Sequence, residues 1–190
     1  MKYLALLLLL ISQSSCSLLF DAADISNRRS NEIAEGATVA GDGFTVHSPE
    51  SGLYSASRDT RPGGITLRPT EPFFDGLVYF VAPFEARRET NLHEVLTKWN
   101  SIPEAKGYKL TVLRKTLTSF DDLPALQAVV EASNGTASQV TSILIIKRSA
   151  DYLILSTGHP YHRPTSRQER QDFTNTRLNK LQAATKINRG

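Results

Sequence analysis

LPALQAVVEAS (residues 123–133) and SQVTSILIIKRSADYLILST (residues 138–157) carry the apolar pattern that decides the fold of this chain. Asn134-Gly135 follows the first run. This dipeptide between alternating runs predicts a two-residue type I′ hairpin, because both turn positions need a positive φ. The segment 149–151 predicts a second tight turn, inside the second run. Three antiparallel strands in a meander follow from the two turns.

Four more strands are expected before this meander. Their runs alternate in polarity or are rich in β-branched and aromatic residues, and they are GFTVHSPE (43–50), GGITLRPT (63–70), DGLVYFVAPFE (75–85) and GYKLTVLRKTLTSF (107–120). Asp121-Asp122 after the last of them is interpreted as a solvated acidic turn.

Two segments have helical spacing instead. The first places apolar residues at i, i+3, i+4 and i+7, namely Leu92, Val95, Leu96 and Trp99. Thr90 is its expected N-cap, and Pro103 bars its continuation. The second begins at a capping box formed by Ser166 and Glu169. The resulting fold class is α+β: an antiparallel β-sheet flanked by helices, whose apolar faces need the sheet as a partner.

The N-terminus predicts export. Lys2 precedes an apolar run, Leu4 to Ile11, which has the length of a signal-peptide core and is too short to span a bilayer. Cys16 is the only cysteine of the chain and follows this run after four polar residues, 12–15. We therefore expect a signal peptide over 1–15 and lipidation of Cys16, for example by palmitate, although Gln13 stands where a lipobox usually has an aliphatic residue. The alternatives are cleavage by signal peptidase I with release of a soluble protein, and an uncleaved anchor.

The charge distribution suggests how the mature chain is organised. Residues 147–190 carry nine Lys/Arg and three Asp/Glu, so the net charge of +3 for the whole chain arises in its C-terminal part. Residues 16–41 begin with the cysteine that we expect to be lipidated. The rest of this segment has charges of both signs and no sustained period, which predicts a flexible tether. Residues 42–190 are expected to form a single α+β domain.

Several local patterns of this domain resemble those of the PsbP-like family. They are the opening strand Phe-Thr-Val-His-Ser-Pro (44–49), the helix before the long strands, Leu-Pro-Ala (123–125) at the start of a strand, Tyr-Leu-Ile-Leu-Ser-Thr (152–157) at the end of the sheet, and the final helix. The resemblance implies a PsbP-like α/β sandwich. It also implies a role in binding or assembly rather than catalysis, since the family includes photosystem II accessory proteins, a Ran-binding branch and bacterial lipoproteins. It transfers no set of functional residues.

Two groups of residues are candidates for function. His159 and His162 form the only close histidine pair, but without a neighbouring cysteine or acidic cluster they predict loop residues and not a metal site. The final helix and the loop before it present a possible basic binding surface, made of Arg163, Arg167, Arg170, Arg177 and Lys180. Phe173, Leu178 and Leu181 should pack on the sheet, so the basic side chains between them should point outward.

The sequence therefore predicts a non-enzymatic lipoprotein of the cell envelope that is held at the membrane through Cys16 and binds a protein partner or a small ligand. No cofactor or metal is predicted. Binding of nucleic acid is not predicted either, because no aromatic residues are interleaved with the basic ones. The alternative is a secreted or periplasmic enzyme of unknown reaction with a site near residues 156–163. A pocket that joins His159 and His162 to an acidic residue would favour the enzyme, and an open basic or aromatic surface would favour binding.

Overall fold

The computed structural model describes residues 32–33, 37–48, 54–58, 63–69, 78–86, 90–104, 106–135, 138–159 and 166–188. Cys16, His162 and Arg163 lie outside these ranges, as do the expected signal peptide and most of the expected tether. No helix in the described ranges is long and apolar enough to cross a membrane.

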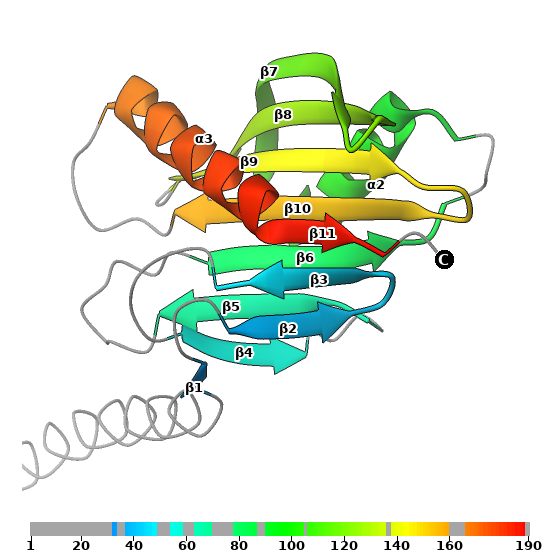
Figure 1. The fold of residues 1–190 in the computed structure, drawn as a ribbon. Coiled ribbons are helices and arrows are strands. Elements are labelled where there is room, and N and C mark those ends of the chain that lie inside the picture. The colour runs from blue at the N-terminus through cyan, green and yellow to red at the C-terminus, as the bar shows by residue number, and fades with distance from the viewer. Residues whose placement is uncertain are drawn as a thin grey trace, which may run out of the picture.

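An eight-stranded antiparallel sheet forms the centre of the molecule (Figure 1). Its strands, in spatial order, are β1 (Glu32–Ile33), β4 (Tyr54–Arg58), β5 (Ile65–Pro69), β6 (Val78–Phe84), β10 (Tyr152–His159), β9 (Ser138–Lys147), β8 (Leu123–Ser133) and β7 (Lys109–Phe120). The order β10-β9-β8-β7 confirms the meander predicted over residues 123–157 and extends it by one strand.

A second, three-stranded sheet lies beside the first and joins the two ends of the domain. It pairs β2 (Thr38–Gly41) with β3 (Phe44–His47) and β3 with β11 (Thr185–Ile187), in the order β11-β3-β2. Residues 32–33 and 38–41 thus form strands of the domain, although the tether was expected to extend to residue 41. The folded part of the chain begins earlier than the charge pattern suggested.

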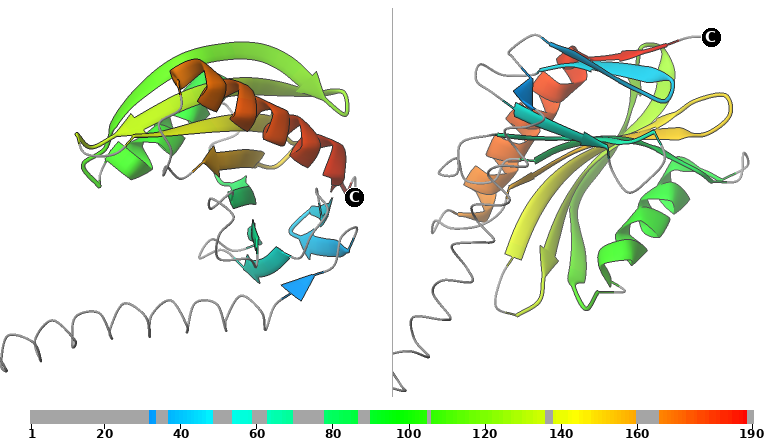
Figure 2. Two further views of the ribbon diagram at one scale, coloured as in Figure 1. Left: turned by 90° about the vertical axis from the view of Figure 1, so that its left-hand side faces the viewer. Right: turned by 90° about the horizontal axis from the view of Figure 1, so that it is seen from below.

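Two helices cover opposite faces of the large sheet (Figure 2). α2 (Leu92–Glu104) packs against β7, β8 and β9 on one face, and α3 (Arg167–Ala184) packs against β9 and β10 on the other. The α+β sandwich predicted from the sequence is confirmed. Because one helix packs on each face of the large sheet, the two faces form two separate cores.

Strict alternation along β9 and β10 divides apolar residues between the two cores. On the α3 face, Leu144, Leu153 and Leu155 pack with Leu178 and Leu181 of the helix. On the α2 face, the strands contribute Ile143, Ile145, Tyr152 and Ile154, which pack with Leu92, Val95 and Leu96 of α2. Because both faces are buried, these strands read in the sequence as almost continuous apolar runs.

The hairpin between β8 and β9 differs from the prediction. Ser133 pairs with Ser138, so the connection holds four residues and not two. Gly135 has a φ of +88°, but Asn134 is not among the residues with positive φ, so the turn is not type I′. Both positive φ values occur instead at Asp121 (48°) and Asp122 (65°), which connect β7 directly to β8. Aspartate tolerates this conformation better than most residues do, and the acidic turn expected at these two residues is confirmed as a two-residue connection.

The helix ends depend on local hydrogen bonds. At α3 the predicted capping box is confirmed: Ser166 Oγ accepts from the Glu169 amide at 3.1 Å, and Glu169 Oε2 accepts from the Ser166 amide at 2.7 Å. At α2 the predicted N-cap is wrong by one residue, because Asn91 Oδ1 accepts from the Glu94 amide at 3.0 Å. Pro103 lies inside the last turn of α2, and the helix ends at Glu104.

Candidate ligand-binding pocket beside helix α2

A pocket of about 320 Å³ opens between the C-terminal half of α2 and the sheet. We call it the α2 pocket. Its described lining residues come from β6, α2, β9 and β10, and they are Val78, Phe80, Trp99, Ile102, Pro103, Gln139, Thr141, Ser156 and Gly158. α2 covers β7, β8 and β9, whereas the neighbouring ends of β10 and β6 extend past the helix. The space between the end of the helix and these strands forms the pocket.

Aromatic and aliphatic side chains form the walls. Trp99 is the only tryptophan of the chain, and it is half-buried at the end of the apolar face of α2. Its ring centroid lies 5.5 Å from that of Phe80 and 6.0 Å from that of Phe84, both on β6. Ile102, one turn further along α2, remains 38% exposed at the pocket rim. Tilted and edge-on aromatic contacts of this kind hold the rings in fixed orientations.

Polar residues form the floor. Gln139 and Thr141 are alternate residues of β9, Ser156 and Gly158 are alternate residues of β10, and Gly158 pairs with Thr141. Ser156 is only 7% exposed. A Cβ at Gly158 would lie 2.5 Å from Gln139 Nε2, so the missing side chain leaves the space that the Gln139 carboxamide occupies.

The chemistry of this lining suits binding. None of its nine described residues carries an ionisable side chain, so they offer neither a general base nor a metal-ligating carboxylate. Ser156 and Gly158, which line the pocket, belong to the segment 156–163, where the alternative prediction placed the site of an enzyme. The side chain of His159, and His162 altogether, lie outside the described part of the structure.

The basic surface predicted on α3 is organised differently from the expectation. Glu131 of β8 faces α3, where it is 8% exposed. Arg167 Nη2 lies 2.8 Å from Glu131 Oε2, and Arg170 Nη2 lies 3.7 Å from Glu131 Oε1. Arg170 also donates to Ser138 Oγ at 2.8 Å, and its side chain is 10% exposed. The outward orientation expected for Arg170 is therefore wrong, because a buried carboxylate attracts its guanidinium toward the sheet.

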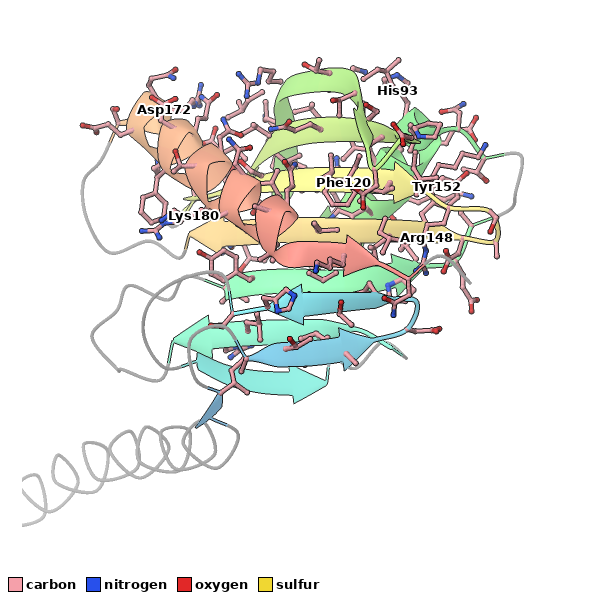
Figure 3. All side chains as sticks on the ribbon, viewed as in Figure 1. His93, Phe120, Arg148, Tyr152, Asp172 and Lys180 are labelled. Atoms are coloured by element: carbon pink, nitrogen blue, oxygen red, sulfur yellow. The ribbon has the colours of Figure 1, made fainter. Side chains whose placement is uncertain are left out.

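The other predicted basic residues of α3 remain at its surface. The Arg177 guanidinium lies over the Phe173 ring, 4.8 Å from the centroid, and partial burial there lowers the pKa of Arg177. Lys180 is exposed, and Figure 3 shows it on the same helix as Asp172. Arg167 is 61% exposed despite its contact with Glu131. The helix thus presents separate cations, and its most buried arginine has a carboxylate partner.

A second, larger pocket of about 620 Å³ lies at the turn ends of the sheets. Arg148 organises it: its Nε donates to Asp151 Oδ1 at 2.6 Å, and its Nη1 donates to the carbonyls of Asp42 (3.1 Å) and Gly43 (3.3 Å). Figure 3 places Arg148 where the β9–β10 turn meets the β2–β3 turn. Within the described ranges, no group of three or more His, Cys, Asp or Glu side chains is arranged to hold a metal ion. We interpret Arg148 as a structural residue that links the two sheets through these hydrogen bonds.

Sequence reasoning missed the α2 pocket, although one signal was present. The residues of β9 that face α2 are Gln139, Thr141, Ile143 and Ile145, so this face changes from apolar to polar toward its N-terminal end. A polar end on a strand that is otherwise buried marks the place where the covering helix stops. Its partner strand shows the same change after Ile154, at Ser156.

Comparison with solved structures identifies the architecture. The chain is similar to a mutant of the protein Mog1, with a TM-score of 0.59 and 13% identity over 80% of this chain and 95% of that one. It is also similar to the Ran-binding protein Mog1p of Saccharomyces cerevisiae, with a TM-score of 0.58 and 12% identity over 83% and 94%. A third similar structure is cyanobacterial PsbP (CyanoP) of Synechocystis, with a TM-score of 0.57 and 9% identity over 82% and 94%.

The chain has a PsbP/Mog1-like fold. No protein-family model matches its sequence, and no curated protein matches it either. At these identities the likeness establishes the fold alone. The fold expected from the resemblance to the PsbP-like family is thus confirmed, and the function depends on the chemistry of the site.

Proposed function

We propose that this protein is a non-enzymatic lipoprotein of the cell envelope that binds a small ligand in the α2 pocket. The observation that carries the proposal is the composition of the pocket: aromatic and aliphatic walls, a polar floor and no ionisable side chain among its described lining residues. Such a lining favours the burial of a molecule over acid–base chemistry on it. This supports binding over the alternative of an enzyme whose site includes Ser156.

The sequence supports the location. A short apolar run ends just before Cys16, which is the only cysteine of the chain. Lipidation there would hold the domain at a membrane surface through residues 17–31, without a membrane-spanning segment. A binding domain on such a tether samples the space next to the membrane.

The comparisons are consistent with a binding role. One solved structure of similar fold is named a Ran-binding protein, and another is named a PsbP protein. Binding of a protein partner remains the second form of this proposal. The cations that α3 leaves exposed, Arg167 and Lys180, favour an acidic surface on such a partner.

The test uses full-length protein extracted from membranes in a mild detergent. Its mass is measured under native and under denaturing conditions. We expect the native mass to exceed the denatured mass by that of one small molecule. Gly158→Val should remove this excess, because the added side chain enters the pocket floor and displaces Gln139.

Thr116→Val is the matched control, since it adds an apolar β-branched residue at an exposed position of β7, outside the lining of the pocket. The control should keep the additional mass. Equal native and denatured masses in the wild-type protein would contradict small-ligand binding, and loss of the excess mass in Thr116→Val would contradict its assignment to this pocket.

A further inference from the structure

The pocket floor presents three polar side chains that make no hydrogen bond with another residue in the described ranges. Ser156 is nine-tenths buried, yet its hydroxyl makes no hydrogen bond with another residue in the described ranges. The side chains of Gln139, which is exposed, and Thr141, which is half-buried, also make no hydrogen bond with another residue in the part of the chain that the structure describes. Buried polar groups in folded proteins are nearly always hydrogen-bonded, and an unsatisfied one destabilises the fold. This consideration applies to Ser156. Gln139 and Thr141 are less buried, and all three side chains face the pocket with donors and acceptors that a ligand can satisfy.

The opposite face of the same two strands provides an internal comparison. There Ser142 Oγ hydrogen-bonds with Thr174 Oγ1 (2.8 Å) and Asn175 Oδ1 (2.9 Å), and Thr157 Oγ1 donates to the Thr174 carbonyl (3.0 Å). Helix α3 thus satisfies the polar residues that β9 and β10 turn toward it. On the other face α2 supplies apolar residues to the pocket, namely Trp99, Ile102 and Pro103, so the helix does not perform this role.

The three groups lie close enough to meet one molecule. Thr141 pairs with Gly158 across the strands, and Gln139 Nε2 lies directly above the position where Gly158 lacks a side chain. Ser156 precedes Gly158 by two residues on the same face of β10. Two hydroxyls and a carboxamide offer both donors and acceptors, so together they accommodate a hydroxyl, a carbonyl or an amide.

The charge and the shape of the pocket lining limit the class of ligand further. Burial of an ion is unfavourable without a counter-charge, and the described lining has none. The walls formed by Val78, Phe80, Trp99 and Ile102 suit a flat apolar body of one or two rings, which the volume of about 320 Å³ accommodates.

On the basis of the proposed function, we infer that the α2 pocket selects a neutral molecule with an apolar body and one hydrogen-bonding head, and that the head contacts Gln139, Thr141 and Ser156. The apolar body packs against Trp99 and Phe80. Affinity comes from the walls and selectivity from the floor.

The experiment uses three probes with the same bicyclic body: tetralin, 2-tetralol and tetralin-2-carboxylate. Trp99 is the only tryptophan, so its emission reports occupancy of the pocket directly when it is excited at the red edge of indole absorption, where the probes do not absorb. We expect 2-tetralol to bind about fivefold more tightly than tetralin, which is the worth of one net hydrogen bond. The carboxylate should bind at least about tenfold more weakly than 2-tetralol, because its charge is buried without a partner.

Variants assign the selectivity to the floor. Ser156→Ala and Thr141→Val should each reduce the preference for 2-tetralol over tetralin and leave the affinity for tetralin unchanged. Gly158→Val should abolish the response to all three probes, and Thr116→Val should leave it unchanged. Circular dichroism of each variant verifies that the fold is retained.

The outcomes separate this inference from the proposed function. Tetralin and 2-tetralol binding equally, or the carboxylate binding most tightly, would overturn the ligand class and leave the pocket as a binding site, provided that Gly158→Val abolishes the signal. If the Trp99 emission of the wild-type protein responds to none of the probes, both the ligand class and the proposed binding of a small ligand in the α2 pocket are overturned. A preference for 2-tetralol that survives Ser156→Ala and Thr141→Val together would place the head elsewhere.

Discussion

Glu131 shows how a single residue can reverse an expectation based on helix periodicity. The spacing of α3 places Arg170 between apolar residues, which suggests a solvent-facing cation. The carboxylate of Glu131 is buried on the same side of the sheet and would be costly to leave unpaired. Arg167 and Arg170 both approach it, and Ser138 accepts a further hydrogen bond from Arg170. The basic surface of α3 is therefore smaller than the count of its arginines suggests.

Removal of Glu131 tests this arrangement. Glu131→Ala removes the carboxylate that lies 3.7 Å from Arg170 Nη2, and the side chain of Arg170 is only 10% exposed. We expect a loss of about 1–3 kcal/mol in the free energy of unfolding, the usual range when a buried polar group loses its partner. Urea denaturation measures it. Glu85→Ala removes an exposed carboxylate after β6 and serves as the control, with little expected effect.

Equal denaturation midpoints for Glu131→Ala and Glu85→Ala would show that the contact with Arg170 contributes nothing to stability. The contact between Glu131 and Arg170 also decides which residues a charge-reversal experiment on α3 should change. Reversal of Arg170 would now place two carboxylates together in a buried site, so a binding experiment on α3 should reverse Arg167 and Lys180 only.

At the level of elements, the start of α3 depends on a reciprocal pair of hydrogen bonds between Ser166 and Glu169. Hydrogen bonds from the backbone and then from the side chain of Ser166 lower the pKa of Glu169 below its ordinary value of 4.5. A carboxyl group whose pKa is lower in the folded state stabilises the fold above the unfolded pKa, and this contribution disappears as the pH falls through the folded pKa.

We therefore expect Glu169→Gln to be less stable than the wild type at neutral pH, and the difference to shrink below pH 4.5 as Glu169 becomes protonated. Thermal unfolding of both proteins over a pH series measures the difference. A difference that stays constant from neutral to acidic pH would mean that the ionised carboxylate is not what stabilises the cap. Glu85→Gln is the control, because it removes an exposed carboxylate that makes no capping contact.

The β8–β9 connection is an element whose backbone conformation limits substitution. Gly135 has a φ of +88°, a value that a β-branched residue adopts only at a cost, although a Cβ there would meet no atom within 4 Å. Gly135→Val should therefore lower the free energy of unfolding by about 1–2 kcal/mol through backbone strain alone.

Gly158→Val is the matched comparison for this turn. Gly158 lies in β10 without a positive φ, and a Cβ there meets only the flexible end of Gln139 and the Thr141 hydroxyl. We expect it to leave the stability nearly unchanged, since valine is favourable in a strand. Chemical denaturation of both variants compares them, and equal losses would rule out φ as the reason for glycine at 135.

At the level of the whole molecule, the lipid anchor proposed at Cys16 would decide where the domain acts. Cys16→Ala should abolish incorporation of radiolabelled fatty acid and release the protein from membranes. Acyl chains contribute about 0.8 kcal/mol per buried CH₂, which the few apolar residues after Cys16, Leu18 to Phe20, do not replace. Membrane fractionation of wild type and variant measures the effect. If both proteins remain in the membrane fraction to the same extent, the anchor lies elsewhere.

The local features of the chain were readable from its sequence. Alternation and helical spacing predicted the β8–β9–β10 meander, both helices and the capping box of Ser166, because each depends on residues within a few positions of one another. The α+β class followed, since two amphipathic helices and a sheet can bury their apolar faces only against each other. Errors at this level were small, such as the N-cap, which lies at Asn91, and the connection at Asn134-Gly135, which is not a two-residue type I′ turn.

Only the tertiary structure decided the direction of Arg170 and the existence of the α2 pocket. Glu131 and Arg170 come from β8 and α3, and the pocket combines Trp99 with Gln139 and Ser156 from three separate elements. No local pattern encodes which residue a distant strand places opposite a helix, or where that helix stops short of the sheet edge. Periodicity determines which face of an element is buried, whereas the register and crossing of the packed elements determine what that face contacts.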